Sequence, residues 1–294
     1  MTTEPSSRAP DSDSLPIGIF ARTFPGQSAD LVVSAIAVMG IRHTQFNLSC
    51  IGLETVPARI PPMAIEEIAR STQQYHVSIS ALSGTCNLIH PDRARRDTFV
   101  RRLANLASVC DTLGIPVLTL STGTRDPDDL WRAHPDNQSA SALDDLRRAL
   151  HALLNATAAN RVTLAFEPEA ANVIQTADQA SSLLDEFDTE RLGVILDSAN
   201  LIGDAPASQQ AAIISHAATV LHGRVTLAHV KDADATHRVV APGQGAIDFA
   251  AYLAALRTLA GYTGPVIMHG LTAAEVPAAL AHLTTARTAA LAPH

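Results

Sequence analysis

Short apolar runs rich in β-branched residues alternate along most of the chain with longer runs that are rich in Ala and Leu. The short runs are typical of strands buried on both faces, and the longer ones of amphipathic helices. We expect strands at 15–20, 43–48, 76–82, 116–120, within 161–172, at 192–197, 225–232 and 265–269. We expect helices near 28–39, 61–75, 91–113, 139–159, 176–187, 206–222, 248–260 and 273–291.

This regular alternation predicts an α/β fold consisting of a single (β/α)8 TIM barrel. A doubly wound open sheet is the alternative, but residues 21–26, after the first strand, lack the GxGxxG turn of such sheets. A chain of 294 residues with 47% hydrophobic content can fill one barrel domain, which we expect over residues 15–294. Residues 1–14 are rich in Ser, Asp and Pro and predict a disordered N-terminal tail.

Charge and composition exclude several classes of partner. The formal net charge of −8 argues against nucleic-acid binding, which requires clustered Lys and Arg, and favours a small neutral or weakly charged ligand. Every apolar run is interrupted by charge, Gly or Pro, so we expect no membrane span. Three scattered cysteines are too few for a disulfide framework, and a reducing cytoplasm is the simplest compartment.

Polar side chains end four consecutive predicted strands in the second half of the chain. Glu167, Asp197, His229 and His269 each stand where an apolar run stops. Parallel strands bring their carboxyl ends to one face of a barrel, so we expect these side chains to lie together. Glu169, two positions after Glu167, should point the same way.

The same alternation places Lys231 on the face of His229, where it either contacts a substrate or pairs with Asp232 or Glu169. Residues an even number of positions before these polar groups on the same strands should point into the barrel and fill it beneath them. We expect this layer to consist of Thr163, Ala165, Gly193, Ile195, Val225, Leu227, Pro265 and Ile267.

Two carboxylates and two imidazoles form a coherent ligand set for one divalent cation. Mixed oxygen and nitrogen ligation suits manganese, zinc, cobalt or iron(II) and disfavours calcium. The cation would cancel the charge of the carboxylates and leave a site able to polarise substrate oxygens. We expect manganese, with zinc, cobalt, iron and magnesium as alternatives; the other reading of His269 is a hydrogen-bonded histidine at the barrel rim.

Four sequence motifs, in order along the predicted strand ends, carry a resemblance to a known family. They are Glu167-Pro-Glu169, Leu196-Asp197-Ser-Ala-Asn200, His229-Val-Lys231-Asp232 and Ala241-Pro-Gly-Gln-Gly-Ala-Ile-Asp248, followed by Gly261-Tyr-Thr-Gly-Pro265. With these motifs the chain resembles the xylose-isomerase-like sugar phosphate isomerase/epimerase superfamily over nearly its whole length after the tail.

The resemblance implies that Glu167, Asp197 and His229 bind a metal. His269 stands where the family has a fourth ligand, a glutamate, and Asn200 stands where it has a histidine. In ketose 3-epimerases of the family, the glutamates of strands five and eight handle protons on opposite faces of the substrate. Here Glu169, Lys231 or a water would have to supply the second proton transfer, or the reaction needs only one face.

The resemblance therefore implies a metal-dependent isomerase or epimerase of a sugar, sugar acid or cyclitol, acting through a metal-stabilised enediolate. Glu167, Glu169 and Lys231 are the catalytic candidates. Many relatives form dimers or tetramers, so a homo-oligomer is expected. The predicted substrate-binding residues, at the ends of other strands and in loops, are Arg22, Asn47, His90, Arg125, Trp131, Asn200 and Arg238.

Three other functions remain as alternatives. A metal-dependent lyase, such as a dehydratase or a C-glycoside-cleaving enzyme, would use the same ligands but expel a leaving group. A non-catalytic sugar-binding barrel would bind its ligand without turnover. An endonuclease IV-like role is disfavoured, because the chain is acidic and lacks the larger ligand set of that branch.

Overall fold

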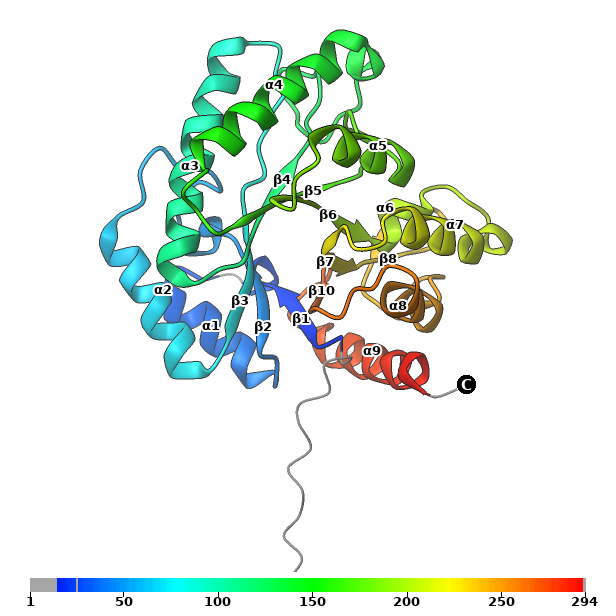
Figure 1. The fold of residues 1–294 in the computed structure, drawn as a ribbon. Coiled ribbons are helices and arrows are strands. Elements are labelled where there is room, and N and C mark those ends of the chain that lie inside the picture. Colours follow the sequence, from blue (N-terminus) through cyan, green and yellow to red (C-terminus); the bar gives the residue numbers. More distant parts are fainter. Residues whose placement is uncertain (1–14, 25, 293–294) are drawn as a thin grey trace, which may run out of the picture.

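The computed structural model describes residues 15–24 and 26–292. Its parallel strands close into a barrel in the order β1-β10-β7-β6-β5-β4-β3-β2, and helices surround it (Figure 1). The predicted (β/α)8 barrel is confirmed. The barrel strands are β1 (Ile17–Phe20), β2 (His43–Phe46), β3 (Ser78–Ser83), β4 (Val117–Ser121), β5 (Thr163–Glu167), β6 (Leu192–Asp197), β7 (Val225–Val230) and β10 (Val266–Met268).

The helices follow the strands at the predicted places. Their ends carry the expected signals: Ser28 caps the first helix through a hydrogen bond from the Leu31 amide, and Gly114 ends the third in the left-handed conformation, with φ of 66°. The α-helices are α1 (Ala29–Val38), α2 (Pro62–Tyr75), α3 (Arg93–Leu113), α4 (Ala140–Ala156), α5 (Ala177–Phe187), α6 (Ser198–Ile202), α7 (Ala207–Val220), α8 (Phe249–Thr258) and α9 (Val276–Leu291).

Several short elements were not predicted from the sequence. Two-residue strands β8 (Asp232–Ala233) and β9 (Val239–Val240) pair antiparallel after β7, and three 3-10 turns occupy Ala21–Thr23, Leu48–Ile51 and Pro135–Gln138. The short helix α6 begins directly after β6, where the Asp197 carboxylate accepts a hydrogen bond from the Asn200 amide. Elements this short have no hydrophobic period of their own, so a sequence pattern does not reveal them.

The interior of the barrel is filled by small and branched side chains that form a cluster separate from the main core. Phe20 packs against this cluster, whose buried members are Ala81, Val117, Ala165, Ile195, Leu227 and Ile267. The predicted inward positions Ala165, Ile195, Leu227 and Ile267 are thereby confirmed, whereas Val225 at the start of β7 packs against the main core instead. Thr163, Gly193 and Pro265 are not members of the interior cluster. Burial of each larger member contributes about 1.5–3 kcal/mol, so the layer forms a stable base beneath the strand ends.

The main core lies between the barrel strands and the surrounding helices. It is dominated by aliphatic side chains, with Phe46, Phe166 and Tyr252 among its largest fully buried members. Within residues 15–24 and 26–292, no helix combines the length and apolar character needed to span a bilayer. The predicted tail, residues 1–14, lies outside the described residues.

Candidate active site at the carboxyl ends of the strands

The four predicted metal ligands meet at the carboxyl end of the barrel. Asp197, His229 and His269 each offer one ligand atom, and these atoms lie within 4.8 Å of one another. Glu167 ends β5 beside them, with its Oε2 3.5 Å from His229 Nδ1, and Asp197 Oδ2 lies 3.6 Å from the same nitrogen. The arrangement follows from the strand order, because β5, β6, β7 and β10 are consecutive neighbours in the barrel.

Three of these groups carry a buried polar atom without a hydrogen-bond partner. They are Asp197 Oδ2, His229 Nδ1 and His269 Nδ1, and only two other side-chain atoms within the described residues share this condition. The charge of Asp197 Oδ2 is nevertheless paired, because Lys231 Nζ lies 3.1 Å away, whereas the two imidazole nitrogens have no such partner. A buried polar atom without a hydrogen bond costs about 1–3 kcal/mol, and a ligand bound between the two nitrogens would offset that cost. One carboxylate oxygen and two imidazole nitrogens, with Glu167 adjacent, fit a borderline divalent cation.

A glutamine on β2 sets the orientation of the His229 ring. The Nε2 atom of His229 lies 2.7 Å from Gln45 Oε1, and Gln45 Nε2 donates to Ser83 Oγ over 3.1 Å. With the amide so oriented, its oxygen accepts the Nε2–H of His229. The other ring nitrogen, Nδ1, then faces the carboxylates of Glu167 and Asp197, as in a ligating imidazole whose second nitrogen is hydrogen-bonded.

Lys231 and Asn200 complete the polar cluster behind the ligands. Lys231 Nζ lies 3.1 Å from Asp197 Oδ2 and donates to Asn200 Oδ1 over 3.0 Å. Asn200 Nδ2 in turn donates to Glu167 Oε1. Of the two pairings predicted for Lys231, neither Asp232 nor Glu169 is its ion-pair partner among the described residues, since Lys231 pairs with Asp197 instead.

The charges of this cluster shift the pKa values of its members in opposite directions. Burial opposes ionisation of Asp197, but the Lys231 ammonium and His229 hold the pKa of Asp197 well below its usual range. Burial also disfavours a charged His229, yet the carboxylates of Glu167 and Asp197 raise its pKa to about 9. Burial and the nearby charges of His229 and Lys231 lower the pKa of His269 to about 3, which keeps its nitrogen lone pair available.

Glu169 is the second carboxylate of the cavity. Burial, followed by the charge of Glu167, raises the pKa of Glu169 to about 7, in the range suited to a general acid or base. Asn172 Nδ2 donates to Glu169 Oε2 over 2.8 Å, while Asn172 Oδ1 accepts from Ser121 Oγ and the Gly123 amide. The carboxylate is therefore held in place at one oxygen only.

A cavity of about 420 Å³ opens above these groups. Glu167, Glu169, His229 and His269 line it, together with three predicted substrate-binding residues. These are Arg22, Asn47 and Trp131; the remaining wall includes Phe20, Gln45, Thr55, Thr85, Thr119, Leu120, Ser121, Leu130 and Ile195. The indole of Trp131 is exposed at the mouth of the cavity, where it can cover a bound molecule.

The structure places three other predicted substrate-binding residues away from this cavity. Arg125 turns into an ion pair with Asp145, at 2.7 Å between Nη2 and Oδ2, and His90 is buried with its Nε2 3.0 Å from the Pro127 carbonyl oxygen. Arg238 pairs with Asp234 in the same exposed loop, at 2.8 Å. None of the three lines the cavity wall. Asn200 is brought to the site, but behind Glu167 rather than on the wall.

Two residues of the site were missed by sequence reasoning. Gln45 contacts His229 across 184 positions of the chain, and Asn172, fully buried, orients Glu169. The sequence signal for Gln45 is the alternation of side chains along a strand. Gln45 lies two positions before Asn47, so its side chain points to the same face. Asn172 lies in a loop, where no periodicity indicates the direction of a side chain.

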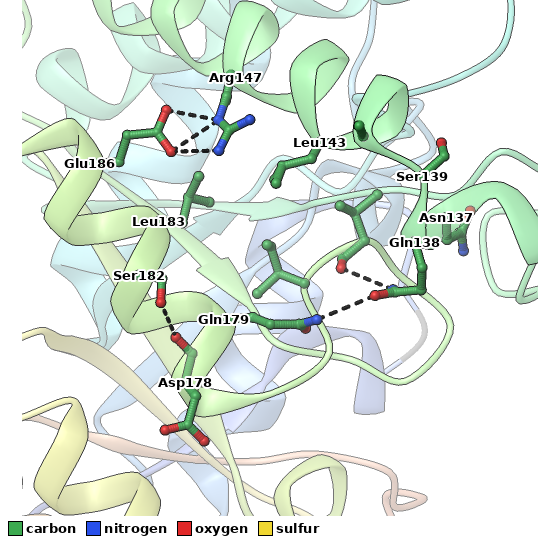
Figure 2. Close-up of a pocket in the computed structure, with 13 residues that line it drawn as sticks. Asn137, Gln138, Ser139, Leu143, Arg147, Asp178, Gln179, Ser182, Leu183 and Glu186 are labelled. Carbon is green, nitrogen blue, oxygen red and sulfur yellow. Dashed lines mark hydrogen bonds and ion pairs between the residues drawn. The ribbon is translucent and has the colours of Figure 1, made fainter.

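A second hollow lies on the outer surface, between α4 and α5 (Figure 2). Its charged wall is already paired, since Arg147 Nε donates to Glu186 Oε2 over 2.9 Å, and Gln179 donates to Gln138 Oε1 over 3.3 Å. None of the predicted site residues lines it. The cavity at the strand ends is therefore the candidate active site.

Several solved structures share the architecture of this chain. By overall structure the chain resembles 3-keto-D-glucoside 4-epimerase from E. coli, with a TM-score of 0.73, 19% identity, and coverage of 92% of this chain and 99% of that one. It also resembles the IOLI protein with a bound zinc atom, with a TM-score of 0.67, 16% identity, and coverage of 94% and 98%. A third similar structure is a xylose isomerase-like TIM barrel protein from Mycobacterium smegmatis in complex with magnesium, with a TM-score of 0.71, 14% identity, and coverage of 97% and 100%.

At these identities the structural likeness shows the fold alone. No curated protein matches the chain in a sequence search. The family model described as xylose isomerase-like TIM barrel matches residues 36–286, which is most of the chain. The motifs at the strand ends, the closed barrel and this match agree, and the chain belongs to the xylose isomerase-like TIM barrel family.

Proposed function

We propose that the protein is a divalent-metal-dependent isomerase or epimerase of a small carbohydrate. The observation that carries the proposal is the convergence of three buried ligand atoms, from Asp197, His229 and His269, beside Glu167. The two imidazole nitrogens among them have no hydrogen-bond partner. A structurally similar protein is a sugar epimerase, and two others hold zinc or magnesium. We propose manganese as the resident ion, with zinc, cobalt, iron or magnesium as alternatives that the same ligands accept.

The residues that would hold the ion are Glu167, Asp197, His229 and His269. When bound there, a divalent cation polarises a substrate carbonyl and its neighbouring hydroxyl, which acidifies the C–H between them. The chain prepares the position: Gln45 turns His229 Nδ1 toward the carboxylates, and Asn200 holds Glu167 by one oxygen. Lys231, charged and paired with Asp197, holds that carboxylate in its ionised form behind the ligands.

Glu169 is our candidate for the proton carrier. It lines the cavity, Asn172 fixes one of its oxygens, and burial raises its pKa above the usual carboxyl range, which suits a group that takes and returns a proton. Glu167 is the other cavity carboxylate, but ligation would occupy it. Lys231 is a poor proton donor, because the carboxylates around it raise its pKa despite its burial.

A metal-dependent lyase remains the second candidate, and the observation that favours it is His269. This histidine occupies the strand-eight position at the end of β10, and burial lowers its pKa to about 3, so it cannot carry protons near neutral pH. One free carboxylate suits chemistry on a single substrate face, such as aldose–ketose isomerisation or β-elimination. Mass analysis of the product separates the two, because isomerisation conserves mass and elimination does not.

The test compares wild type with Glu167→Ala, His269→Ala and Glu169→Gln after chelation and after Mn²⁺ addition. We expect wild type to bind about one ion and to melt at a higher temperature when loaded. Glu167→Ala and His269→Ala should lose that increase, whereas Glu169→Gln should keep the ion but lose turnover in a sugar screen. If chelated wild type neither takes up metal nor gains stability, the proposed function fails and a sugar-binding barrel becomes the leading account.

A further inference from the structure

Arg22 is a cation of the cavity without a counter-charge. It lies in the 3-10 turn Ala21–Thr23 directly after β1, it is exposed, and it lines the cavity wall. Within the described residues its guanidinium forms no ion pair and no side-chain hydrogen bond. Lys231, the other cation of the site, is by contrast buried and paired with Asp197.

Asn47 supplies further hydrogen-bond donors next to Arg22. It directly follows β2, the barrel neighbour of β1. The register pairs Phe20 with Gln45, so Arg22 and Asn47, two positions further on, follow adjacent strand ends. The Asn47 side-chain oxygen is used twice, accepting from the Ser49 amide at 2.9 Å and from Thr55 Oγ1 at 3.2 Å. Its amide nitrogen has no hydrogen-bond partner among the described side chains, although the residue is 2% exposed and lines the cavity.

Arg22 and Asn47 therefore present only donors to this corner of the cavity. A guanidinium has N–H groups in a planar fork and no acceptor, and the free half of the Asn47 amide adds two more N–H groups. Such a corner suits a planar carboxylate or a phosphate better than a neutral hydroxyl, because oxyanions accept without needing to donate.

The charge of the site points the same way. The carboxylates of Glu167, Glu169 and Asp197 are formally balanced by Lys231 together with a divalent cation. Arg22 is then the excess positive charge, at the mouth of the cavity, and an anionic group on the substrate would neutralise it. The chain is acidic overall, which makes an unpaired arginine at this position more informative than it would be on a basic surface.

We propose that Arg22 and Asn47 form a subsite for an anionic group, so that the substrate is a sugar acid or a sugar phosphate rather than a neutral sugar. This inference rests on the proposed function, because Arg22 and Asn47 would bind the anionic end of the substrate that the same cavity holds. Carboxylate and phosphate share the recognising chemistry, and the test below separates them.

The experiment measures binding of D-glucuronate, inorganic phosphate and D-glucose by calorimetry to the Mn²⁺-loaded protein. Arg22→Gln removes the charge, Arg22→Lys keeps it without the planar fork, and Asn47→Asp keeps the acceptor for Ser49 while replacing the donors by a negative charge. Arg42→Gln is the matched control, since Arg42 precedes β2 at the opposite end of the barrel and bonds to the Ala37 and Ile41 carbonyl oxygens. Melting temperatures check that every variant is folded.

We expect wild type to bind an anionic probe more tightly than glucose. Arg22→Gln and Asn47→Asp should weaken anion binding roughly tenfold or more, and Arg42→Gln should leave it unchanged. Tighter binding of D-glucuronate than of inorganic phosphate indicates a carboxylate, and the reverse order indicates a phosphate. Arg22→Lys shows whether the planar fork is needed beyond its charge. The subsite is refuted if wild type does not prefer anions, or if Arg22→Gln binds them as wild type does. Failure of the wild-type protein to bind Mn²⁺ would instead refute the proposed function. The failure of the subsite and the failure of the proposed function are therefore distinguishable.

Discussion

Replacing Gln45 by leucine should weaken both the fold and the proposed metal site, because one buried hydrogen bond supports both. His229 is 3% exposed, and its Nε2–H is accepted by Gln45 Oε1 at 2.7 Å. Leucine fills similar space but leaves that donor unsatisfied, at a cost of about 1–3 kcal/mol. Loss of the partner that orients a ligating imidazole also lowers metal affinity by about 10- to 100-fold, which corresponds to about 1.4–2.7 kcal/mol.

Two measurements test this prediction separately. Urea unfolding of the chelated protein reports the first cost, and competition with a chromophoric chelator reports the second. In the zinc-loaded protein, ¹⁵N chemical shifts of His229 should show ligation through Nδ1 in wild type and a mixture of ring nitrogens in Gln45→Leu. Gln45→Glu is the control, because it retains an acceptor for Nε2–H. Unchanged unfolding and unchanged metal affinity in Gln45→Leu would refute the role of Gln45.

The remaining predictions concern the residues that support the site. Asp145→Asn should cost about 3 kcal/mol at pH 7, because Asp145 is a mostly buried partner of Arg96, Arg125 and Arg148. Burial opposes the charge of Asp145, but the arginines lower its pKa. The stabilisation is therefore complete above the ordinary carboxyl pKa and is lost as the pH falls through the lower, folded-state pKa. Urea unfolding that shows the same loss of stability for Asp145→Asn at pH 7 and at pH 2 would contradict this. Gly123→Ala should cost about 2–4 kcal/mol, since φ is +84° and a Cβ would overlap Asn87 Oδ1, and thermal melts that match wild type would disprove it.

Hydrophobic periodicity was sufficient to predict the barrel and the end of it that carries the site. Eight apolar runs separated by helical ones leave few topologies, and parallel strands necessarily bring Glu167, Asp197, His229 and His269 to one face. Parity likewise identified Ala165, Ile195, Leu227 and Ile267 as interior positions, because alternate side chains of a strand point to opposite sides. These predictions depend only on local chain geometry.

Tertiary structure alone decided which polar residues near the strand ends face the cavity. Arg125 and His90 follow strands as Arg22 does, yet they turn toward Asp145 and the Pro127 carbonyl oxygen. The partners of Gln45 and Asn172 lie on other strands or loops. The direction of a loop side chain is set by such distant hydrogen bonds and charges, for which the sequence carries no period, whereas strand side chains are directed by the backbone itself.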